Sequence, residues 1–545
     1  MTMIMNILFA VGLSAHPIET MEPLSDNCIL IAGTNDIHGH LEPHRVYRGE
    51  TYAEMGGIGA MSAYIDSLRR WSRGNFALFD GGDAYHGTYE SNAAYGRDVI
   101  KLMNLMGYDA MALGNHEFDF GARPNSPKDP RGYLKERLIE AEFPILSSNI
   151  LRTDNSNVDW KNLNTHTTLT VGSLRVGVIG VSTIETVYTT HPRNVVGLKF
   201  EAPHTRVVKT SEMLRAQGAD LIVLTSHIGG KCSDLSDPHD ISSCDTDEEL
   251  FELLNTIPKG TVDVAIGGHT HQVLAHYVND VATIESGSYA RNLSLVKACK
   301  TTDRVTTTVL PPLPLCLTTF ADGTCSSTGT ESAIRTRYFL GEPLVTPKEI
   351  EEVISDALLR ASKLSERQMG IELITPLTRL PHDDSPLGSA IANAILASSE
   401  AEVAIQNRGG VRSDLPRGTI NHRQLYTVLP FANRITMLEM SASDLLTMLD
   451  HMASRRSGLL PYVAGYQVSR VDGGLVIRDE NGQIPPGKVL TVAVNDYLAA
   501  GGENLGDFFQ QRPSIQQRET DILLFDAVAH YLRNLSPASL TLLNP

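Results

Sequence analysis

The stretch Cys28-Ile-Leu-Ile-Ala-Gly-Thr-Asn-Asp36-Ile-His38-Gly39 gives the strongest indication of the fold. Its first half is an apolar run typical of a buried strand, and its second half is polar. Alternation along an extended chain places Asp36 and His38 on one side, where the carboxylate and the imidazole can bind the same ion. Alone the motif is weak, because a capping aspartate beside a surface histidine has the same spacing.

Four more polar clusters follow apolar runs in the same way. They are Gly81-Gly-Asp83 after Ala77-Leu-Phe-Asp80, Gly114-Asn115-His116-Glu-Phe-Asp119 after Met111-Ala-Leu113, Thr225-Ser-His227 after Leu221-Ile-Val-Leu224, and Gly267-Gly-His269-Thr-His271 after Val262-Asp-Val-Ala-Ile266. Each falls where a strand is predicted to end, and each offers oxygen or imidazole donors suited to Mn, Zn, Fe or Co. Repetition at five strand ends predicts a shared metal centre.

Length and composition predict a folded chain of two or more domains. The 545 residues exceed the ~250–300 at which single cores stop growing. With 42% hydrophobic and 20% charged residues, the composition is that of a globular protein. The net charge of −17 argues against a long nucleic acid partner, whose backbone it would repel, but not against a small anionic substrate bound beside metals.

The chain divides into four predicted parts. Residues 1–25 hold the predicted signal peptide and N-terminal segment, and residues 26–340 form an α/β domain whose last part, from 301, is irregular or hairpin-like. Thr346-Pro-Lys-Glu349 marks the start of a linker helix within residues 341–368. A second domain spans residues 369–545.

The N-terminus and the cysteines indicate export. Residues 3–12 are an apolar run of signal-peptide length, followed by small residues at Ser14 and Ala15, although a disordered N-terminus is the alternative. No later run of ~20 apolar residues predicts a membrane anchor. Six cysteines suit an oxidising compartment, with reduced thiols as the alternative if the signal is false. The preferred pairs are Cys232 with Cys244, Cys316 with Cys325, and by remainder Cys28 with Cys299. We therefore expect a periplasmic or secreted protein.

The order of these motifs resembles the calcineurin-like metallophosphoesterases, specifically the 5'-nucleotidase and UDP-sugar hydrolase family. The resemblance implies a four-layered α/β/β/α catalytic domain followed by an α/β substrate domain. It also implies two divalent metal ions, with Mn, Zn or Co as the candidates. By position, Asp36, His38 and His271 would hold one ion, Asn115, His227 and His269 the other, and Asp83 both. His116 and Asp119 match the catalytic dyad of the family. His40 and His44 are expected on the exposed surface rather than at a pocket rim, and whether His86 faces the substrate stays open.

Three segments of the second domain resemble nucleotide-recognition segments of the same family. They are Gln406-Asn407-Arg408-Gly-Gly-Val-Arg412, Leu429-Pro-Phe431-Ala-Asn433 and Asn495-Asp-Tyr497-Leu-Ala-Ala-Gly-Gly-Glu503. The resemblance gives Asn407 and Arg412 to the phosphate, Phe431 and Tyr497 to the two faces of the base, and Glu503 to the ribose. Two aromatic faces tolerate many bases, since stacking is insensitive to base identity.

Two departures bear on specificity. Asp383 stands where the family has an arginine, which removes one phosphate contact unless Arg379 or Arg408 replaces it, and Glu503 stands where the family has aspartate. We expect an enzyme that releases phosphate from nucleoside 5'-monophosphates, extending to di- and triphosphates or UDP-sugars. One alternative is a 2',3'-cyclic-nucleotide 2'-phosphodiesterase with 3'-nucleotidase activity. Another, of a different class, is a secreted binding protein without catalysis.

Overall fold

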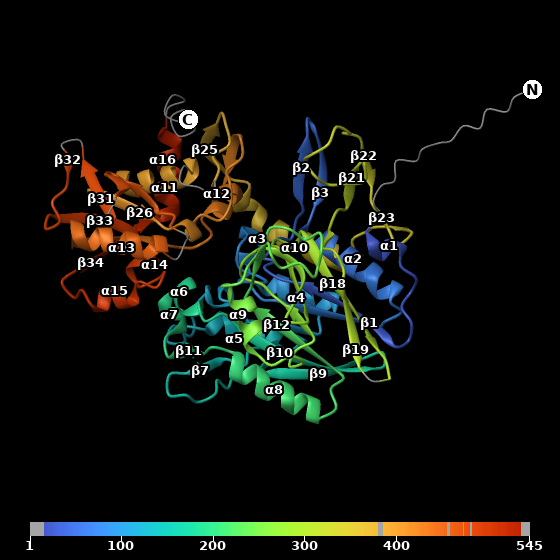
Figure 1. Ribbon diagram of the computed structural model, residues 1–545. Coiled ribbons are helices and arrows are strands. Elements are labelled where there is room, and N and C mark those ends of the chain that lie inside the picture. Colours follow the sequence, from blue (N-terminus) through green and yellow to red (C-terminus); the bar gives the residue numbers. More distant parts are fainter. Residues whose placement is uncertain are drawn as a thin grey trace, which may run out of the picture.

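The computed structural model describes residues 16–302, 304–379, 385–454, 458–471, 474–479 and 482–535. The apolar run at residues 3–12 and the departure at Asp383 lie outside these ranges. Figure 1 shows two bodies, one from the blue-to-yellow part of the chain and one from the orange-to-red part.

The first body contains two stacked sheets. The order in the first sheet is β19 (Val305–Val309), β18 (Asn292–Lys300), β1 (Cys28–Thr34), β4 (Phe76–Asp80), β5 (Ala110–Ala112), β6 (Ile145–Leu146) and β8 (Leu163–Asn164), with β20 (Leu313–Pro314) also beside β18. The order in the second sheet is β16 (Val273–Val278), β17 (Val281–Ser286), β15 (Val264–Ile266), β12 (Leu221–His227), β10 (Leu174–Ser182) and β9 (His166–Val171). A two-stranded pair, β7 (Ile150–Arg152) with β11 (Leu198–Phe200), adjoins them.

Alternation along the strands explains the layers. In β1, Ile29 and Ile31 pack between the two sheets, whereas Leu30 and Ala32 pack against the outer helices. The helices over the first sheet are α2 (Gly57–Trp71), α4 (Arg97–Met106) and α5 (Gly132–Glu140), and those over the second are α8 (His204–Ala216) and α9 (Glu249–Thr256). The predicted four-layered α/β/β/α domain is thus confirmed.

The strand directions bring the polar clusters to one edge of the sandwich. β1, β4 and β5 are mutually parallel neighbours in the first sheet, and β10, β12 and β15 are parallel neighbours in the second. Parallel strands end at the same edge, so the loops that follow them converge. Short elements built into these loops are α3 (Tyr89–Asn92), η1 (His116–Phe118), α6 (Thr186–Thr189) and α7 (Pro192–Val195).

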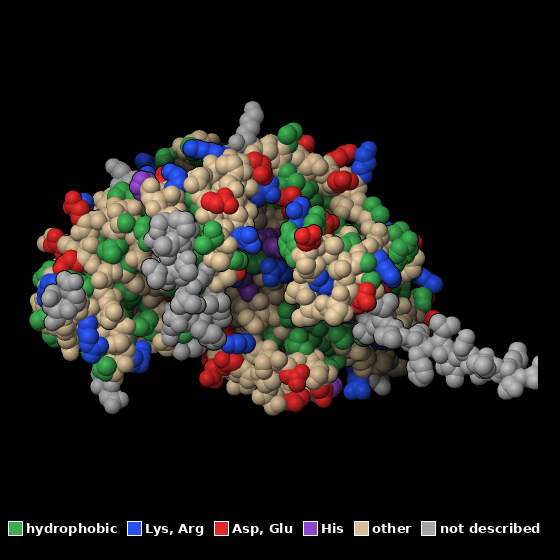
Figure 2. Space-filling view, turned by 90° about the horizontal axis from the view of Figure 1, so that it is seen from above, with side chains coloured by type: hydrophobic (Ala, Val, Ile, Leu, Met, Phe, Trp, Pro, Cys, Tyr) green, Lys and Arg blue, Asp and Glu red, His purple; other side chains and the backbone are tan. Residues whose placement is uncertain are grey.

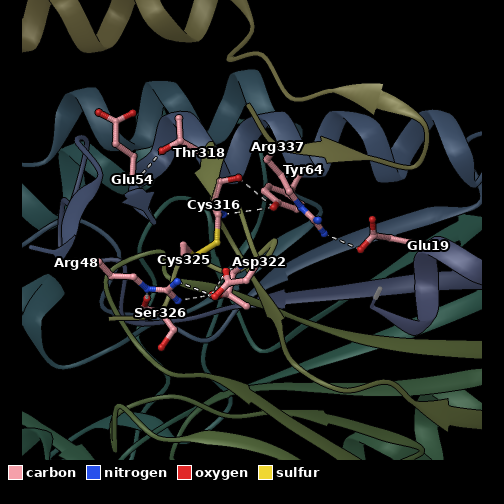
Figure 3. The surroundings of a disulfide bond; sticks show 11 residues. Glu19, Arg48, Glu54, Tyr64, Cys316, Thr318, Asp322, Cys325, Ser326 and Arg337 are labelled. Atoms are coloured by element: carbon pink, nitrogen blue, oxygen red, sulfur yellow. Dashed lines mark hydrogen bonds and ion pairs between the residues drawn. A yellow bond between two sulfur atoms is a disulfide. The ribbon is translucent and has the colours of Figure 1, made fainter. Parts of the chain in front are cut away.

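The segment after β20 forms short hairpins, as predicted for an irregular edge. Its strands are β21 (Thr318–Phe320), β22 (Ile334–Thr336), β23 (Tyr338–Phe339) and β24 (Glu342–Pro343), next to the hairpin of β2 (His44–Arg48) and β3 (Thr51–Met55). Figure 3 shows the Cys316–Cys325 disulfide in this region, where the Tyr64 hydroxyl donates to the Cys316 carbonyl at 3.2 Å. The same view shows Arg337 paired with Glu19 at 2.6 Å.

The other two disulfides also match the predicted pairs. Cys28 faces Cys299 directly across β1 and β18, and Cys232 faces Cys244 across β13 (Lys231–Cys232) and β14 (Cys244–Asp245). The chain already packs against the domain at α1 (Pro17–Thr20), where Ile18 is fully buried in the core. No described helix combines the length and apolar character needed to cross a bilayer.

Helix α10 (Lys348–Ser365) connects the two bodies. Ile350, Val353 and Ala357 on its first half join the core of the first body, and their i, i+3, i+7 spacing places them on one face of the helix. The helix begins at Lys348, within the predicted capping segment Thr346-Pro-Lys-Glu349.

The second body is an α/β domain, as expected. Its main sheet has the order β29 (Tyr462–Ala464), β26 (Val403–Gln406), β33 (Val489–Asn495), β28 (Arg434–Ser441) and β34 (Gln516–Leu523). One face packs on α11 (Pro386–Ala397) and α16 (Leu524–Asn534), the other on α13 (Ala442–Ser454). The remaining elements are β25 (Gln368–Leu373), η2 (Arg408–Gly410), β27 (Gly418–Asn421), α12 (His422–Val428), β30 (Gln467–Val471), β31 (Gly474–Asp479), β32 (Gly482–Gln483), α14 (Asp496–Ala499) and α15 (Gly506–Gln510).

Candidate functional site

The predicted donors meet at the converging strand ends in two groups. Asp36, His38 and His271 form one group, and Asp83, His227 and His269 form the other, each with its ligand atoms within 4.8 Å of one another. The Asn115 side-chain oxygen lies 3.0 Å from His227 Nε2, which adds it to the second group. Asp83 Oδ2 lies 3.1 Å from His227 Nε2 and 3.9 Å from His38 Nε2, between the two groups.

Two of the imidazoles are oriented by backbone carbonyls. The Nδ1–H groups of His38 and His227 donate to the carbonyls of His86 and Gly81, both at 2.8 Å. A carbonyl oxygen can only accept a hydrogen bond, so the proton of each neutral ring lies on Nδ1. The lone pair is then on Nε2, which points toward the two groups of predicted metal donors. This arrangement is typical of metal-binding histidines.

The donor set fits divalent cations. Asp36 Oδ1 is buried with no hydrogen-bond donor, and it lies 3.2 Å from His271 Nε2. The Nε2 atoms of His38 and His271 face each other at 3.0 Å. An unsatisfied carboxylate oxygen beside converging nitrogen lone pairs is costly when buried, and a cation would satisfy all three. The residues therefore suit a divalent metal ion.

Electrostatics keep the central carboxylates charged. Burial alone would raise the pKa of Asp83, but the imidazoles of His227, His116 and His38 hold this pKa below its ordinary value. Burial would also raise the pKa of Asp36. The imidazoles of His271 and His38 instead hold this pKa well below its usual range. Both side chains are therefore anionic at neutral pH, as metal ligands must be.

The local backbone differs from the sequence prediction at the first motif. β1 ends at Thr34, and both Asp36 and His38 have left-handed φ angles, 49° and 50°. The two side chains converge through this tight turn and not by alternation along an extended strand. The extended interpretation was wrong because periodicity does not reveal where a strand stops.

His116 and Asp119 lie beside the metal donors. His116 Nδ1 is 2.5 Å from Asp119 Oδ2, and the Thr190 hydroxyl donates to Asp119 Oδ1 at 2.6 Å. The His116 amide donates to Asp83 Oδ1 at 2.8 Å, which couples the dyad to the centre. Burial favours neutral Asp119, but His116 and His86 lower its pKa below the ordinary value.

The second-domain residues that the sequence predicts to bind substrate line the same cavity as the predicted metal donors. This cavity has a volume of about 1050 Å³, and its wall includes Asp83, Asn115, His116, His269 and His271 from the first domain. From the second domain the wall includes Asn407, Arg412, Phe431, Tyr497 and Glu503. Figure 2 shows a hollow near the middle of one face that contains histidine and cationic side chains.

The second-domain residues are arranged by the ends of its sheet. Asn407 follows β26, and Tyr497 follows the parallel strand β33. The Asn407 amide donates to Glu503 at 3.1 Å, and the Asn407 side-chain oxygen accepts from Asn495 at 2.8 Å. The Tyr497 hydroxyl donates to the Tyr188 carbonyl across the cavity. Asn407, Glu503 and Tyr497 thus lie together at the domain interface.

Phe431 lies closer to the dyad than its predicted role as a base clamp suggests. Its ring stacks on His86 and His116, with centroid distances of 5.4 and 5.8 Å. The Arg412 guanidinium lies 5.9 Å from the centre of the Phe431 ring.

Several residues of the site were not predicted from sequence. Glu185 lies 3.3 Å from His269 Nε2, and it follows β10 much as the predicted clusters follow their strands, which is a signal that could have identified it. Buried Glu285 accepts from the Thr270 hydroxyl at 2.7 Å and from the Gln272 amide at 3.1 Å. Glu285 sits inside β17, where sequence gives no such signal.

His40 and His44 are less exposed than the sequence analysis predicts. The rings of His40 and His44 lie 4.8 Å apart, and the His40 ring contacts Tyr289 in a tilted arrangement with centroids 4.3 Å apart. Both side chains are partly buried, so the expectation of an exposed surface position was wrong. Tyr289 in turn contacts His38 and His271, which places this cluster behind the metal donors.

Comparisons with known proteins agree with this geometry. Residues 29–273 match the calcineurin-like phosphoesterase family, and residues 372–511 match the 5'-nucleotidase C-terminal domain family. Protein UshA of Salmonella pullorum is 25% identical over 91% of this chain and 90% of its own length. Snake venom 5'-nucleotidase of Naja atra is 27% identical over 87% of this chain and 90% of its own length. The crystal structure of a 5'-nucleotidase precursor from Thermus thermophilus superimposes with a TM-score of 0.75 at 22% identity, covering 93% of this chain and 96% of that one.

Proposed function

Because the chain belongs to the calcineurin-like phosphoesterases that carry a 5'-nucleotidase C-terminal domain, we propose that it hydrolyses nucleoside 5'-monophosphates to nucleoside and phosphate. The observation that carries the proposal is the shared cavity, whose wall contains metal donors, the dyad and the residues predicted to hold a nucleotide. A cavity of about 1050 Å³ is large enough for a nucleotide, since small-molecule sites span ~300–1,000 Å³.

The proposed metal ligands are Asp36, His38 and His271 for one ion, and Asn115, His227 and His269 for the other, with Asp83 shared. Bound divalent ions supply an activated water and positive charge for the phosphoryl group. The protein prepares this chemistry by keeping Asp36 and Asp83 anionic and by directing the Nε2 atoms of His38 and His227 inward.

The dyad acts on the phosphoryl oxygens. Asp119 holds the Nδ1 side of His116, which leaves the opposite nitrogen free to donate to an oxygen in the cavity. That hydrogen bond strengthens as negative charge develops on the oxygen during hydrolysis. Arg412 adds a planar, permanently charged fork for the same group, since it lines the same cavity.

Nucleotide recognition is assigned to the second domain. Tyr497 and Phe431 supply aromatic faces for the base, and the linked pair Asn407 and Glu503 supplies polar contacts for phosphate and ribose. Because stacking is insensitive to base identity, we expect a broad choice of base.

A wider substrate range is the second candidate. The cavity wall also includes Lys128, Arg193 and Val196, which belong to neither the metal donors nor the nucleotide residues. This extra space supports action on nucleoside di- and triphosphates or UDP-sugars, in which the phosphate carries a larger substituent.

The test is a substrate panel on chelated enzyme, with Mn, Zn, Co and Mg restored separately. We expect AMP to be hydrolysed fastest, followed by ADP and UDP-glucose, only after a divalent ion returns. Preference for 2',3'-cyclic AMP would favour the cyclic phosphodiesterase instead. Nucleotide binding without turnover under any metal would favour a binding protein. Phe431→Ala and Tyr497→Ala should raise KM for AMP about tenfold, while hydrolysis of glycerol phosphate, which has no base, changes little.

Export to the periplasm or the exterior is part of the proposal. Three disulfides support it, because such bonds persist in oxidising compartments. N-terminal sequencing of protein recovered from the periplasm or medium tests this, and a mature chain that begins at Met1 would contradict it.

A further inference from the structure

Asp119 has two imidazole partners and not one. Its Oδ2 atom lies 2.5 Å from His116 Nδ1 and 3.2 Å from His86 Nδ1. The two rings are nearly parallel, at 12°, with centroids 5.8 Å apart. His86 comes from the loop after β4, three residues beyond Asp83, and it belongs to neither group of metal donors described above.

The three side chains form an enclosed pocket of donors at the cavity wall. His86 and His116 are 5% and 8% exposed, and Phe431 of the second domain stacks over both rings at 20° and 25°. The ligand atoms of His86, His116 and Asp119 all lie within 4.8 Å of one another. The surrounding protein thus holds two nitrogen donors and one carboxylate oxygen together, with an apolar ring on one side.

This donor set has the composition of a transition-metal site. Two imidazoles and one carboxylate, with an open fourth position, suit zinc and copper. Bonds of ~2.0–2.1 Å in tetrahedral geometry separate the ligand atoms by roughly 3.3 Å. The 3.2 Å between His86 Nδ1 and Asp119 Oδ2 meets this requirement, and the 2.5 Å contact of His116 has to widen by less than an ångström.

We propose that His86, His116 and Asp119 form a third cation site, at which excess zinc inhibits the enzyme. The inhibition rests on the proposed function, because a cation on His116 Nδ1 replaces its bond to Asp119 and removes His116 from the phosphoryl group. Arg412 lies near this site, and its positive charge weakens cation binding there. The third ion is therefore bound more weakly than the ions of the main centre, which has seven proposed donors.

The experiment starts from enzyme already loaded with two equivalents of zinc, so that metal exchange at the main centre does not interfere. Equilibrium dialysis against rising zinc chloride, without substrate, should reveal a third equivalent. Phosphate release from AMP, measured in parallel, should fall over the same range of free zinc. His86→Gln should weaken binding of the third equivalent at least tenfold, and Asp119→Asn should do the same in dialysis. His204→Gln, which alters an exposed histidine at the start of α8, should bind the third equivalent normally.

The two proposals fail in different ways. If the enzyme hydrolyses AMP but binds only two zinc ions, or if His86→Gln binds the third ion as tightly as the native protein, the third site is disproved and the nucleotidase proposal stands. If no phosphate is released under any condition, the nucleotidase proposal fails, whereas dialysis still decides whether the third ion binds. Should His86→Gln fold poorly, the Asp119→Asn dialysis gives the answer.

Discussion

At the scale of single residues, the proposed metal donors have an unusual backbone. Asp36, His38, Asp83, His269 and His271 all have φ between 49° and 76°, in the left-handed region. Non-glycine residues there cost ~1–3 kcal/mol each and persist only where the surroundings impose the geometry, most often at functional sites. The chain therefore gives up stability to direct these side chains inward.

The first prediction concerns the carboxylate between the two groups. Asp83→Ala should lower kcat/KM for AMP by more than ~100-fold and reduce bound metal, because it removes the shared ligand and the acceptor of the His116 amide. Metal analysis and steady-state kinetics measure both effects. Asp280→Ala, at an exposed carboxylate paired with Lys259, is the control and should change neither. An Asp83→Ala enzyme with normal turnover would refute the site assignment.

The second prediction concerns pH. Burial, with Arg291 nearby, lowers the pKa of His44 from 6.5 to about 4. The folded protein takes up this proton less readily than the unfolded chain, so the contribution of His44 to stability is present above pH 6.5 and is lost as pH falls from 6.5 to 4. At about 1.4 kcal/mol per pH unit, the ceiling is roughly 3 kcal/mol.

Urea unfolding of chelated protein at pH 4 and pH 7 measures this effect. The native protein should lose up to about 3 kcal/mol more than His44→Gln over this range. His204→Gln should behave like the native protein. Equal losses in the native protein and His44→Gln would show that His44 does not resist protonation.

Residue identities could be predicted from sequence, but their supporting partners could not. Asp36, His38 and the other donors repeat one pattern, a polar cluster directly after an apolar run. Glu185 contacts His269, His86 contacts Asp119 and Glu285 contacts Thr270, at separations of 84, 33 and 15 positions along the chain. Such contacts depend on how loops cross, and local pattern does not encode this.

At the scale of elements, the loop between β15 and β16 depends on the neighbouring strand β17. Glu285 of β17 accepts from the Thr270 hydroxyl and the Gln272 amide, on either side of His271. It also accepts from the Gly230 amide at 3.3 Å. One buried carboxyl group thus fixes the loop that carries two proposed donors.

The third prediction follows from this anchor. Glu285→Leu should weaken metal binding and lower kcat/KM about 10–100-fold, the usual range for groups that position metal ligands. Glu285→Gln keeps an acceptor oxygen and should retain most of the affinity. Zinc titration by calorimetry measures both variants. Equal zinc affinity in the two variants would mean that the loop between β15 and β16 keeps its conformation without the Glu285 carboxyl group.

Strand ends could be predicted well, whereas the details of the loops could not. β4 and β15 end at the predicted residues, Asp80 and Ile266, whereas β12 runs three residues past the predicted Leu224 and includes His227. The turn at Asp36 and His38 was misjudged as extended chain. Hydrophobic periodicity locates buried strands, but a turn depends on hydrogen bonds such as the one from the Asp36 amide to the Gly82 carbonyl at 2.9 Å, which come from another loop.

At the scale of the whole molecule, Arg423 ties the domains together. From α12 it pairs with Glu42 and with Glu90 of the first domain, the latter at 2.7 Å, and with Glu366 at 3.1 Å. Glu90 is only 6% exposed, and burial raises its pKa. Arg423 is therefore the counter-charge that allows Glu90 to stay ionised at the interface.

The fourth prediction is that Arg423→Ala destabilises the domain interface. Glu90 is buried, but the Arg423 side chain is 28% exposed. The loss of stability should therefore be smaller than the ~3–5 kcal/mol of a fully buried pair, and thermal unfolding should begin a few degrees lower. The radius of gyration from small-angle scattering should also increase. Arg70→Ala, which removes exposed pairs with Asp66 and Glu342 within the first domain, should have little effect. An unchanged scattering profile for Arg423→Ala would show that other contacts hold the domains.

The two-domain organisation could be predicted, but the way the domains face each other could not. Length, the capped helix and the second set of apolar segments indicated two bodies and a connector. The stacking of Phe431 on His86 and His116 joins side chains more than three hundred residues apart, and no sequence pattern marks it. Judged by sequence alone, Phe431 after Pro430 resembles ordinary core packing.

The spread of the donors along the chain also has a consequence for biosynthesis. The first proposed ligand, Asp36, belongs to the loop after β1, and the last, His271, comes only after β15. A ribosome that has translated only as far as the end of β15 has not yet made His269 and His271. On the proposed ligand set, every shorter nascent chain lacks part of the metal centre, so hydrolysis of phosphate esters should begin only after nearly the whole first domain has been translated.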